Sequence, residues 1–158
     1  MLTGADESGR PLLVKILIGE ACFISESMAV DILQLENPIV PLVPARTRSI
    51  DIKGINSFLR KYECVIMPQF TTTASKMESL FSINAIVAGG ERIKNALHFI
   101  HSRGLVHMDV KPPNIFVDTD GNWFLGDYGS CVKIGETIHS CSEQFLPVST
   151  QNQSTTSL

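Results

Sequence analysis

The sequence predicts an α+β fold, and three stretches carry this prediction. Residues 1–17 read as a strand, a polar turn and a second strand, because two apolar runs flank a cluster of turn residues. Residues 83–102 carry apolar side chains at helical spacing. Residues 115–125 form two apolar triplets around a short polar segment, which is typical of a β-hairpin. The chain therefore combines short strands with at least one long helix.

Composition favours one globular domain. The chain has 158 residues, of which 44% are hydrophobic and 18% charged, enough to build a core. A formal net charge of −3 offers no basic field, so we expect no nucleic acid partner. No apolar run reaches membrane-spanning length and no signal-peptide pattern opens the chain, so we expect no membrane partner. Four scattered cysteines without a CxxC pair predict reduced thiols and a cytoplasmic location: Cys22, Cys64, Cys131 and Cys141.

The most informative stretch reads LVHMDVKPPNIFV over residues 105–117 and is followed by Asp127 after the predicted hairpin. Asp109, Lys111 and Asn114 are spaced so that one tight loop can aim a carboxylate, an ammonium and an amide oxygen into the same cleft. A carboxylate can accept a hydroxyl proton, a cation can bind phosphate, and oxygen ligands suit Mg²⁺. The pattern predicts Mg-assisted phosphoryl transfer. The alternative is a surface turn rich in Asp and Pro that closes a hairpin.

The spacing His107-x-Asp109-x-Lys111-x-x-Asn114, followed by Asp127-Tyr128-Gly129, resembles the catalytic loop and metal-binding triplet of eukaryotic protein kinases. The resemblance implies a bilobal kinase-like fold, here incomplete, with a partial small β lobe and the first part of the helical large lobe. It implies ATP and Mg²⁺ as cofactors. Asp109 and Lys111 would be catalytic, Asn114 and Asp127 would bind the metal and the nucleotide, and Lys111 favours Ser/Thr over Tyr acceptors.

The resemblance also gives Lys15 a role. In the family a strand lysine contacts the α- and β-phosphates of ATP, and Lys15 lies within such a strand. The alternative is a strand-edge lysine that reaches water. Residues 20–35 are predicted to be helical and should carry the glutamate partner of that lysine. Counting along the helix puts the partner at Met28 or Ala29, neither of which is acidic, with Glu26 and Asp31 as the nearest candidates. This departure makes the ion pair doubtful.

The rest of the small lobe is predicted to lead to the hinge. Residues 37–42 resemble a turn and strand, and residues 44–60 are predicted to be a long polar loop that is either a solvated connector or a docking surface for acidic partners. Residues 64–70 should form a buried strand that ends at the hinge. There Met67 would be the gatekeeper, and Gln69 and Phe70 would offer backbone groups to adenine. Since Pro68 has no N–H, any hinge donor must lie at Gln69 or beyond.

In the large lobe, residues 75–78 have capping-box spacing, which predicts a short helix. Gly89 and Gly90 should weaken the helix at 83–102 by about 1 kcal/mol each relative to alanine. His98 and His101 are three residues apart on it, so a metal pair is a minor alternative. The predicted apolar stripe of this helix consists of Ile83, Ile86, Val87, Ile93, Leu97 and Ile100.

The predicted organisation is one partial kinase domain over residues 1–147 and a disordered tail over residues 148–158. Residues 1–70 would be the small-lobe part with the hinge, and residues 71–147 the start of the large lobe with the activation segment from Ser130. No glycine-rich loop precedes Lys15, and the later large-lobe helices are absent from the sequence. We therefore expect the apolar stripe to be exposed or covered by a protein partner.

Two functions fit this sequence. The first is an ATP-dependent protein Ser/Thr kinase acting on a protein hydroxyl, and the alternative is a catalytically inactive kinase-like binding module (pseudokinase) or fragment. Met108 replaces the arginine that in most kinases of the family binds a phosphate on the activation segment. We therefore expect activity not to depend on phosphorylation at Thr137, Ser140 or Ser142.

Overall fold

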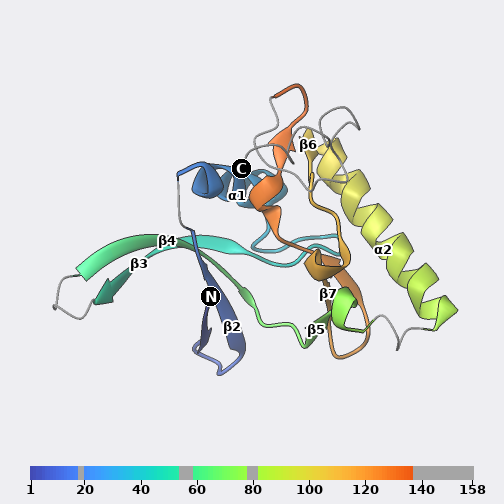
Figure 1. The fold of residues 1–158 in the computed structure, drawn as a ribbon, viewed down its shortest axis with the longest axis horizontal. Coiled ribbons are helices and arrows are strands. Elements are labelled where there is room, and N and C mark those ends of the chain that lie inside the picture. The colour runs from blue at the N-terminus through green and yellow to red at the C-terminus, as the bar shows by residue number, and fades with distance from the viewer. Residues whose placement is uncertain (18–19, 54–58, 78–81, 137–158) are drawn as a thin grey trace, which may run out of the picture.

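The computed structural model describes residues 1–17, 20–53, 59–77 and 82–136. Strands and helix α1 occupy the N-terminal half, and helix α2 with a short hairpin occupies the other half (Figure 1). One core of buried apolar side chains runs through both halves. Within the described residues, no helix is both long enough and apolar enough to cross a bilayer.

A four-stranded antiparallel sheet forms the small lobe, in the order β1-β2-β4-β3. Its strands are β1 (Leu2–Ala5), β2 (Pro11–Ile16), β3 (Arg46–Lys53) and β4 (Leu59–Pro68). The predicted hairpin over residues 1–17 is confirmed, and the β2–β4 register places Lys15 opposite Val65. Because β2 lies between β1 and β4, Lys15 is on an inner strand.

The predicted long loop at residues 44–60 is wrong, because most of it forms β3 and the start of β4. These two strands make a ribbon that reaches away from the body of the molecule (Figure 1). Ile50 lies opposite Tyr62, and the Ser49 hydroxyl donates to Glu63 at 2.6 Å. Three β-branched residues lie in β3 (Thr47, Ile50 and Ile52), and residues 50–53 alternate apolar with charged, which suits a half-exposed strand better than a loop.

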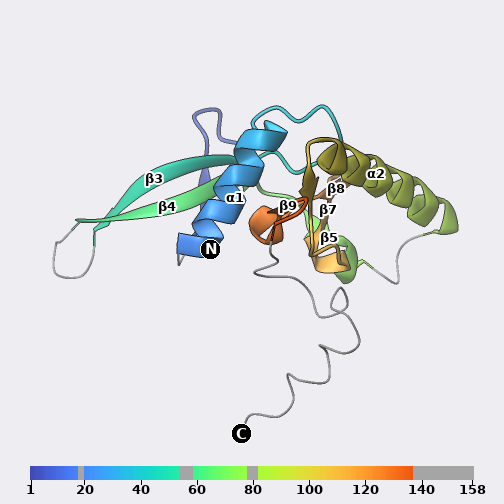
Figure 2. The ribbon, with the colours of Figure 1, turned by 90° about the horizontal axis from the view of Figure 1, so that it is seen from above.

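Helix α1 (Glu20–Leu33) lies between the sheet and the 3₁₀ turn η3 (Tyr128–Ser130), as Figure 2 shows from above. Its buried face carries Ala29, Val30 and Leu33. The strand predicted at residues 37–42 is wrong, since this connector makes only one parallel bridge, from Leu42 to Leu125. Two prolines at positions 38 and 41 remove the backbone donors that a strand would need.

The large-lobe part contains α2 (Ile83–Ser102), whose predicted bounds are confirmed, and a sheet of order β5-β7-β8. These strands are β5 (Thr72–Thr73), β7 (Ile115–Val117) and β8 (Trp123–Leu125), so the predicted hairpin is also confirmed. The short helix expected at residues 75–78 is instead one 3₁₀ turn, η1 (Ala74–Lys76), without a side-chain cap. Glu78 lies outside the described residues.

The predicted apolar stripe of α2 is exposed in its first half, as expected, and buried further along the helix. The buried residues of α2 are Gly89, Ile93, Ala96 and Ile100, whereas Ile83, Ile86 and Val87 are exposed. In Figures 1 and 2 the first turns of α2 stand clear of the other labelled elements. The helical period alone could not indicate where this contact with the rest of the fold begins.

Gly89 has a packing role that the sequence did not reveal. A Cβ atom at this position would lie 2.2 Å from Cδ2 of Trp123. Only glycine therefore allows the indole ring of Trp123, in β8, to pack this closely against α2. The helix-weakening effect of Gly89 is thus offset by contact with a large apolar ring. Gly90 has open space around the same position.

Candidate active site

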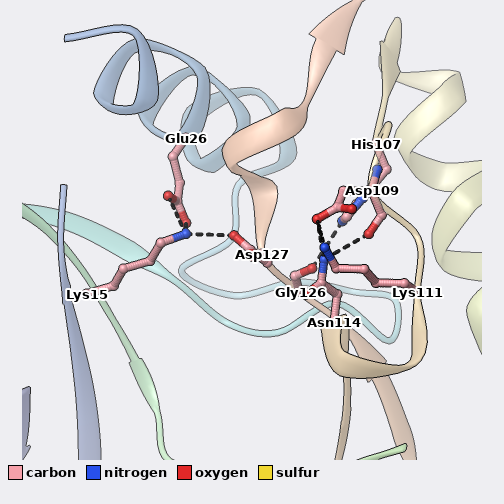
Figure 3. A network of polar contacts seen from close by, with 8 residues as sticks. All are labelled: Lys15, Glu26, His107, Asp109, Lys111, Asn114, Gly126 and Asp127. Atoms are coloured by element: carbon pink, nitrogen blue, oxygen red, sulfur yellow. Dashed lines mark hydrogen bonds and ion pairs between the residues drawn. The ribbon is translucent and has the colours of Figure 1, made fainter. Parts of the chain in front are cut away.

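The loop between β6 (Leu105–Val106) and β7 gathers four polar side chains, His107, Asp109, Lys111 and Asn114, which we call the catalytic-loop cluster (Figure 3). Oδ2 of Asp109 lies 2.9 Å from Nζ of Lys111 and accepts from the Asn114 amide at 2.8 Å. The same amide nitrogen donates to the Asp109 carbonyl at 2.8 Å. Both amide hydrogens face acceptors, so the amide oxygen of Asn114 is the atom left for a cation.

His107 is the most deeply buried member of this cluster, with 1% of its surface exposed. Its Nε2 lies 3.1 Å from the Gly126 carbonyl, and its Nδ1 lies 3.4 Å from the Asp109 backbone nitrogen. A carbonyl only accepts and an amide N–H only donates, so this environment requires the neutral ring protonated on Nε2. Burial lowers the pKa of His107 below its ordinary value, which agrees with that assignment. His107 thereby joins the catalytic loop to the end of β8.

A second cluster combines Lys15 from β2, Glu26 from α1 and Asp127 from the residues after β8; we call it the three-element cluster. Nζ of Lys15 lies 2.9 Å from Oε2 of Glu26 and 2.6 Å from Oδ1 of Asp127. Figure 3 shows Lys15 between the two carboxylates. These contacts contradict the alternative in which Lys15 only reaches water.

The predicted partner position at Met28 or Ala29 is wrong, and the lysine–glutamate pair is present through Glu26. Glu26 precedes the buried residues Ala29, Val30 and Leu33 by three, four and seven positions. This i, i+3, i+4, i+7 spacing puts Glu26 on the inward face of α1. Glu26 was one of the two nearest acidic candidates in the sequence, but the spacing within α1 does not indicate which residue of the sheet this face contacts. Asp31 is exposed and takes no part.

Burial and charge compete within this pair. Burial lowers the pKa of Lys15, but Glu26 and Asp127 more than reverse that effect, so the pKa lies above its ordinary value. Burial raises the pKa of the fully buried Glu26, and the charge of Lys15 offsets only part of that rise. Lys15 is therefore held firmly protonated beside a carboxylate that has lost its water.

Asp127 is held in an uncommon backbone conformation, with φ of 61° and ψ of 80°. A non-glycine residue in this left-handed region costs of order 1 kcal/mol or more unless its surroundings fix it. The Gly126 amide donates to the Asn114 carbonyl at 3.0 Å, which brings the ends of the two motifs together. Nevertheless the side chains face different partners: Asp127 points to Lys15 and Asn114 to Asp109 (Figure 3).

The hinge differs from expectation in one respect. Met67 is buried on β4 opposite Leu13, as a gatekeeper would be. The Gln69 N–H donates to the Pro11 carbonyl at 3.0 Å, so it belongs to the sheet and is not offered to a ligand. Since Pro68 has no N–H, the first donor left for adenine is that of Phe70. The Phe70 ring packs against Phe116 and Phe124, with ring centroids 5.5 and 5.4 Å away.

Other predicted features fall outside the site. The described residues hold no group of three metal-ligating side chains, so His98 and His101 have no third ligand there. A groove of about 450 Å³ lies between α2 and the hairpin, lined by residues that include His98, His101 and Trp123, and it contains no residue of the catalytic-loop cluster or the three-element cluster. In the activation segment, β9 (Val132–Lys133) pairs with β6. Thr137, Ser140, Ser142 and the tail lie outside the described residues.

Comparison with known proteins agrees with this geometry. Residues 52–152 match the family model described as the protein kinase domain. The chain is 30% identical over 135 residues to the serine/threonine-protein kinase US3 homolog of Gallid herpesvirus 2, covering 83% of this chain and 30% of that protein. It is also 30% identical over 105 residues to the serine/threonine-protein kinase STE20 of Eremothecium gossypii, covering 64% of this chain and 11% of that protein. The chain thus spans less than a third of these relatives.

The fold itself is similar to a solved structure, that of the Cydia pomonella Granulovirus kinase, PK-1. The TM-score is 0.67 at 15% sequence identity, over 89% of this chain and 51% of that chain. At this level of identity the likeness concerns the fold alone. The predicted kinase-like arrangement of a β lobe followed by a helical lobe is confirmed by it.

Proposed function

Because this chain belongs to the protein kinase domain family, we propose that it binds ATP with Mg²⁺ and transfers the γ-phosphate to a Ser or Thr hydroxyl of a protein. The observation that carries the proposal is the three-element cluster. Lys15, Glu26 and Asp127 come from positions far apart in the sequence and meet within 2.9 Å of one ammonium group. Protein kinases require the strand lysine, the helix glutamate and the triplet aspartate in place together.

The chemistry of the side chains fits the two cofactors. Asp127 offers a carboxylate and Asn114 an amide oxygen, which are ligands that Mg²⁺ prefers. Lys15 offers a cation for phosphate oxygens, with Glu26 holding it in position. At the hinge, Met67 would line the adenine pocket and the Phe70 backbone would face the base. When bound, ATP supplies the phosphoryl group and Mg²⁺ neutralises its developing charge.

Within the catalytic loop we assign the proton acceptor and its support. Asp109 would accept the proton of the substrate hydroxyl, and its carboxylate is oriented by Lys111 and Asn114. Lys111 is about two-fifths exposed, so its ammonium can also reach an incoming phosphate. The lysine at this position and the names of the relatives, which are serine/threonine-protein kinases, support Ser or Thr as the proposed acceptor.

The test has two stages. The first measures binding of a fluorescent ATP analogue with and without Mg²⁺, for the parent chain, Lys15→Met and a control, Asp120→Asn, on an exposed turn. We expect Mg-dependent binding that Lys15→Met weakens and the control leaves intact. The second measures transfer of labelled phosphate to a generic protein. Binding without transfer would contradict the kinase proposal and favour a kinase-like binding module.

A further inference from the structure

Tyr128 carries a hydroxyl that the protein kinase signature lacks, since the middle residue of that triplet is phenylalanine. The side chain is 2% exposed. Its hydroxyl lies 2.8 Å from the Leu125 carbonyl and 3.0 Å from the Val43 carbonyl. Burial raises the pKa of Tyr128 well above its ordinary value, so the hydroxyl stays protonated and remains a donor. The ring fills the core, whereas the hydroxyl makes a separate polar contact.

The two carbonyls belong to segments that already meet. Leu125 ends β8, and Val43 lies in the connector between α1 and β3. The Leu125 N–H donates to the Pro41 carbonyl at 3.0 Å, and the Val43 N–H donates to the Leu125 carbonyl at 2.8 Å. The Tyr128 hydroxyl has one proton, which the two carbonyls share in a three-centre bond, and its contact with Val43 adds a third link between this connector and the triplet. It therefore ties the segment that presents Asp127 to the chain that leaves α1, the helix carrying Glu26.

We propose that the Tyr128 hydroxyl is a positioning group that holds Asp127 directed at Lys15. Asp127 needs such restraint, because its left-handed backbone is unfavourable by itself. On the preceding side, His107 fixes the Gly126 carbonyl. On the following side, Tyr128 fixes the chain through Leu125 and Val43. The role of Asp127 in metal binding, and hence the use of this restraint, rests on the proposed kinase function.

The size of the effect follows from one neutral hydrogen bond. Its net contribution is worth about a 2- to 10-fold change in an equilibrium constant. Tyr128→Phe keeps the ring and removes only the hydroxyl. Tyr62→Phe is a matched control, because it removes the other tyrosine hydroxyl of the chain, on the β3–β4 ribbon.

The first measurement does not need nucleotide. Amide hydrogen exchange of residues 126–131 is compared in the parent chain, Tyr128→Phe and Tyr62→Phe. We expect about 2- to 10-fold faster exchange in this segment for Tyr128→Phe and no change for Tyr62→Phe. An unchanged rate would overturn the proposal, and so would an increase spread evenly over the whole chain, which indicates general destabilisation.

The second measurement separates positioning from folding. Affinity for a fluorescent ATP analogue is measured with and without Mg²⁺. Tyr128→Phe should reduce the gain in affinity given by Mg²⁺ by about 2- to 10-fold and leave Mg-free affinity unchanged, because only the former uses Asp127. Equal loss in both conditions, or a larger gain from Mg²⁺, would overturn the positioning role. If the parent chain shows no Mg-dependent binding, the proposed kinase function fails, and hydrogen exchange alone decides whether Tyr128 restrains the triplet.

Discussion

The catalytic-loop cluster and the three-element cluster lie close together but are built in different ways (Figure 3). In the first, His107, Asp109, Lys111 and Asn114 come from eight consecutive positions. In the second, the lysine contacts residues 11 and 112 positions away. A local cluster forms whenever its loop forms. The distant one exists only when the sheet, α1 and the end of β8 are correctly assembled.

The two clusters also differ in charge. The carboxylate of Asp109 faces the ammonium of Lys111, so that pair is neutral. Lys15 faces two carboxylates, so one cation against two anions leaves a net charge of −1 in the three-element cluster when Glu26 is ionised. An added positive charge is therefore favoured beside Lys15 and Asp127 more than beside Asp109. Under the proposed function, the three-element cluster supplies the negative charge that attracts the cation, and the catalytic-loop cluster supplies the proton acceptor together with a neutral ligand oxygen from Asn114.

The substitution with the largest expected effect is in the catalytic-loop cluster. Asp109→Asn removes the proton acceptor and retains the size of the side chain. We expect kcat to fall by about 10²- to 10⁴-fold with ATP affinity nearly unchanged. Steady-state phosphate transfer and nucleotide binding measure the two quantities, with Asp120→Asn as control. A variant as fast as the parent chain would remove the role assigned to Asp109.

The next effect concerns the stability of the three-element cluster. Lys15→Met leaves the buried Glu26 carboxylate without its nearest cation, which should lower the free energy of unfolding by about 2–3 kcal/mol. The double variant Lys15→Met with Glu26→Gln removes the stranded charge and should recover part of that loss. Urea unfolding at pH 7 measures the parent chain, the single variants Lys15→Met and Glu26→Gln, and the double variant. Additive losses would mean that the ion pair does not couple the sheet to α1.

A smaller effect is expected when the Asp→Asn substitution is made in the three-element cluster. Asp127→Asn should reduce the Mg-dependent part of ATP affinity by about 10- to 100-fold, since a charge-assisted contact is lost. Mg-free binding should remain, because Lys15 and Glu26 still form their pair. Titration of the nucleotide at several Mg²⁺ concentrations measures this. Equal Mg dependence in the parent chain and in the variant would show that Asp127 does not bind the cation.

The smallest effect is a pH dependence that belongs to His107. Burial lowers the pKa of His107 below the ordinary value of 6.5, so the folded protein binds this proton less readily than the unfolded chain. Its contribution to stability is complete above pH 6.5 and is lost as the pH falls toward the depressed pKa. Thermal unfolding between pH 7.5 and 5 should show this loss, and His107→Asn should reduce it. His101 is exposed, so the control variant His101→Asn should lose thermal stability at low pH to the same extent as the parent chain. If His107→Asn also loses as much stability as the parent chain, the pH dependence does not come from His107.

Local patterns were the part of the fold that could be predicted. Apolar periodicity and turn residues, which are local properties, predicted three features of the fold. These are the bounds of α2, the hairpin at residues 115–125 and the hairpin within residues 1–17. The β3–β4 ribbon was missed because its charges suggested a loop, although its β-branched residues Thr47, Ile50 and Ile52 fit a strand. The strand expected at residues 37–42 failed because its prolines cannot donate to a sheet. Contacts between residues far apart in the sequence, such as that of Gly89 with the Trp123 ring, are not indicated by any local sequence pattern.

The sequence by itself determined the catalytic-loop cluster, because its residues are separated by at most seven positions and one short loop holds them together. It also determined which residue types meet there, and thus the kind of chemistry. Only the tertiary structure decided that Glu26 is the partner of Lys15, that the Gln69 N–H is used by Pro11, and that the Tyr128 hydroxyl reaches Val43. Each of these contacts joins segments whose distance depends on how the sheet packs on α1 and β8. That distance is set by burial of a shared core, and spacing along the chain does not encode it.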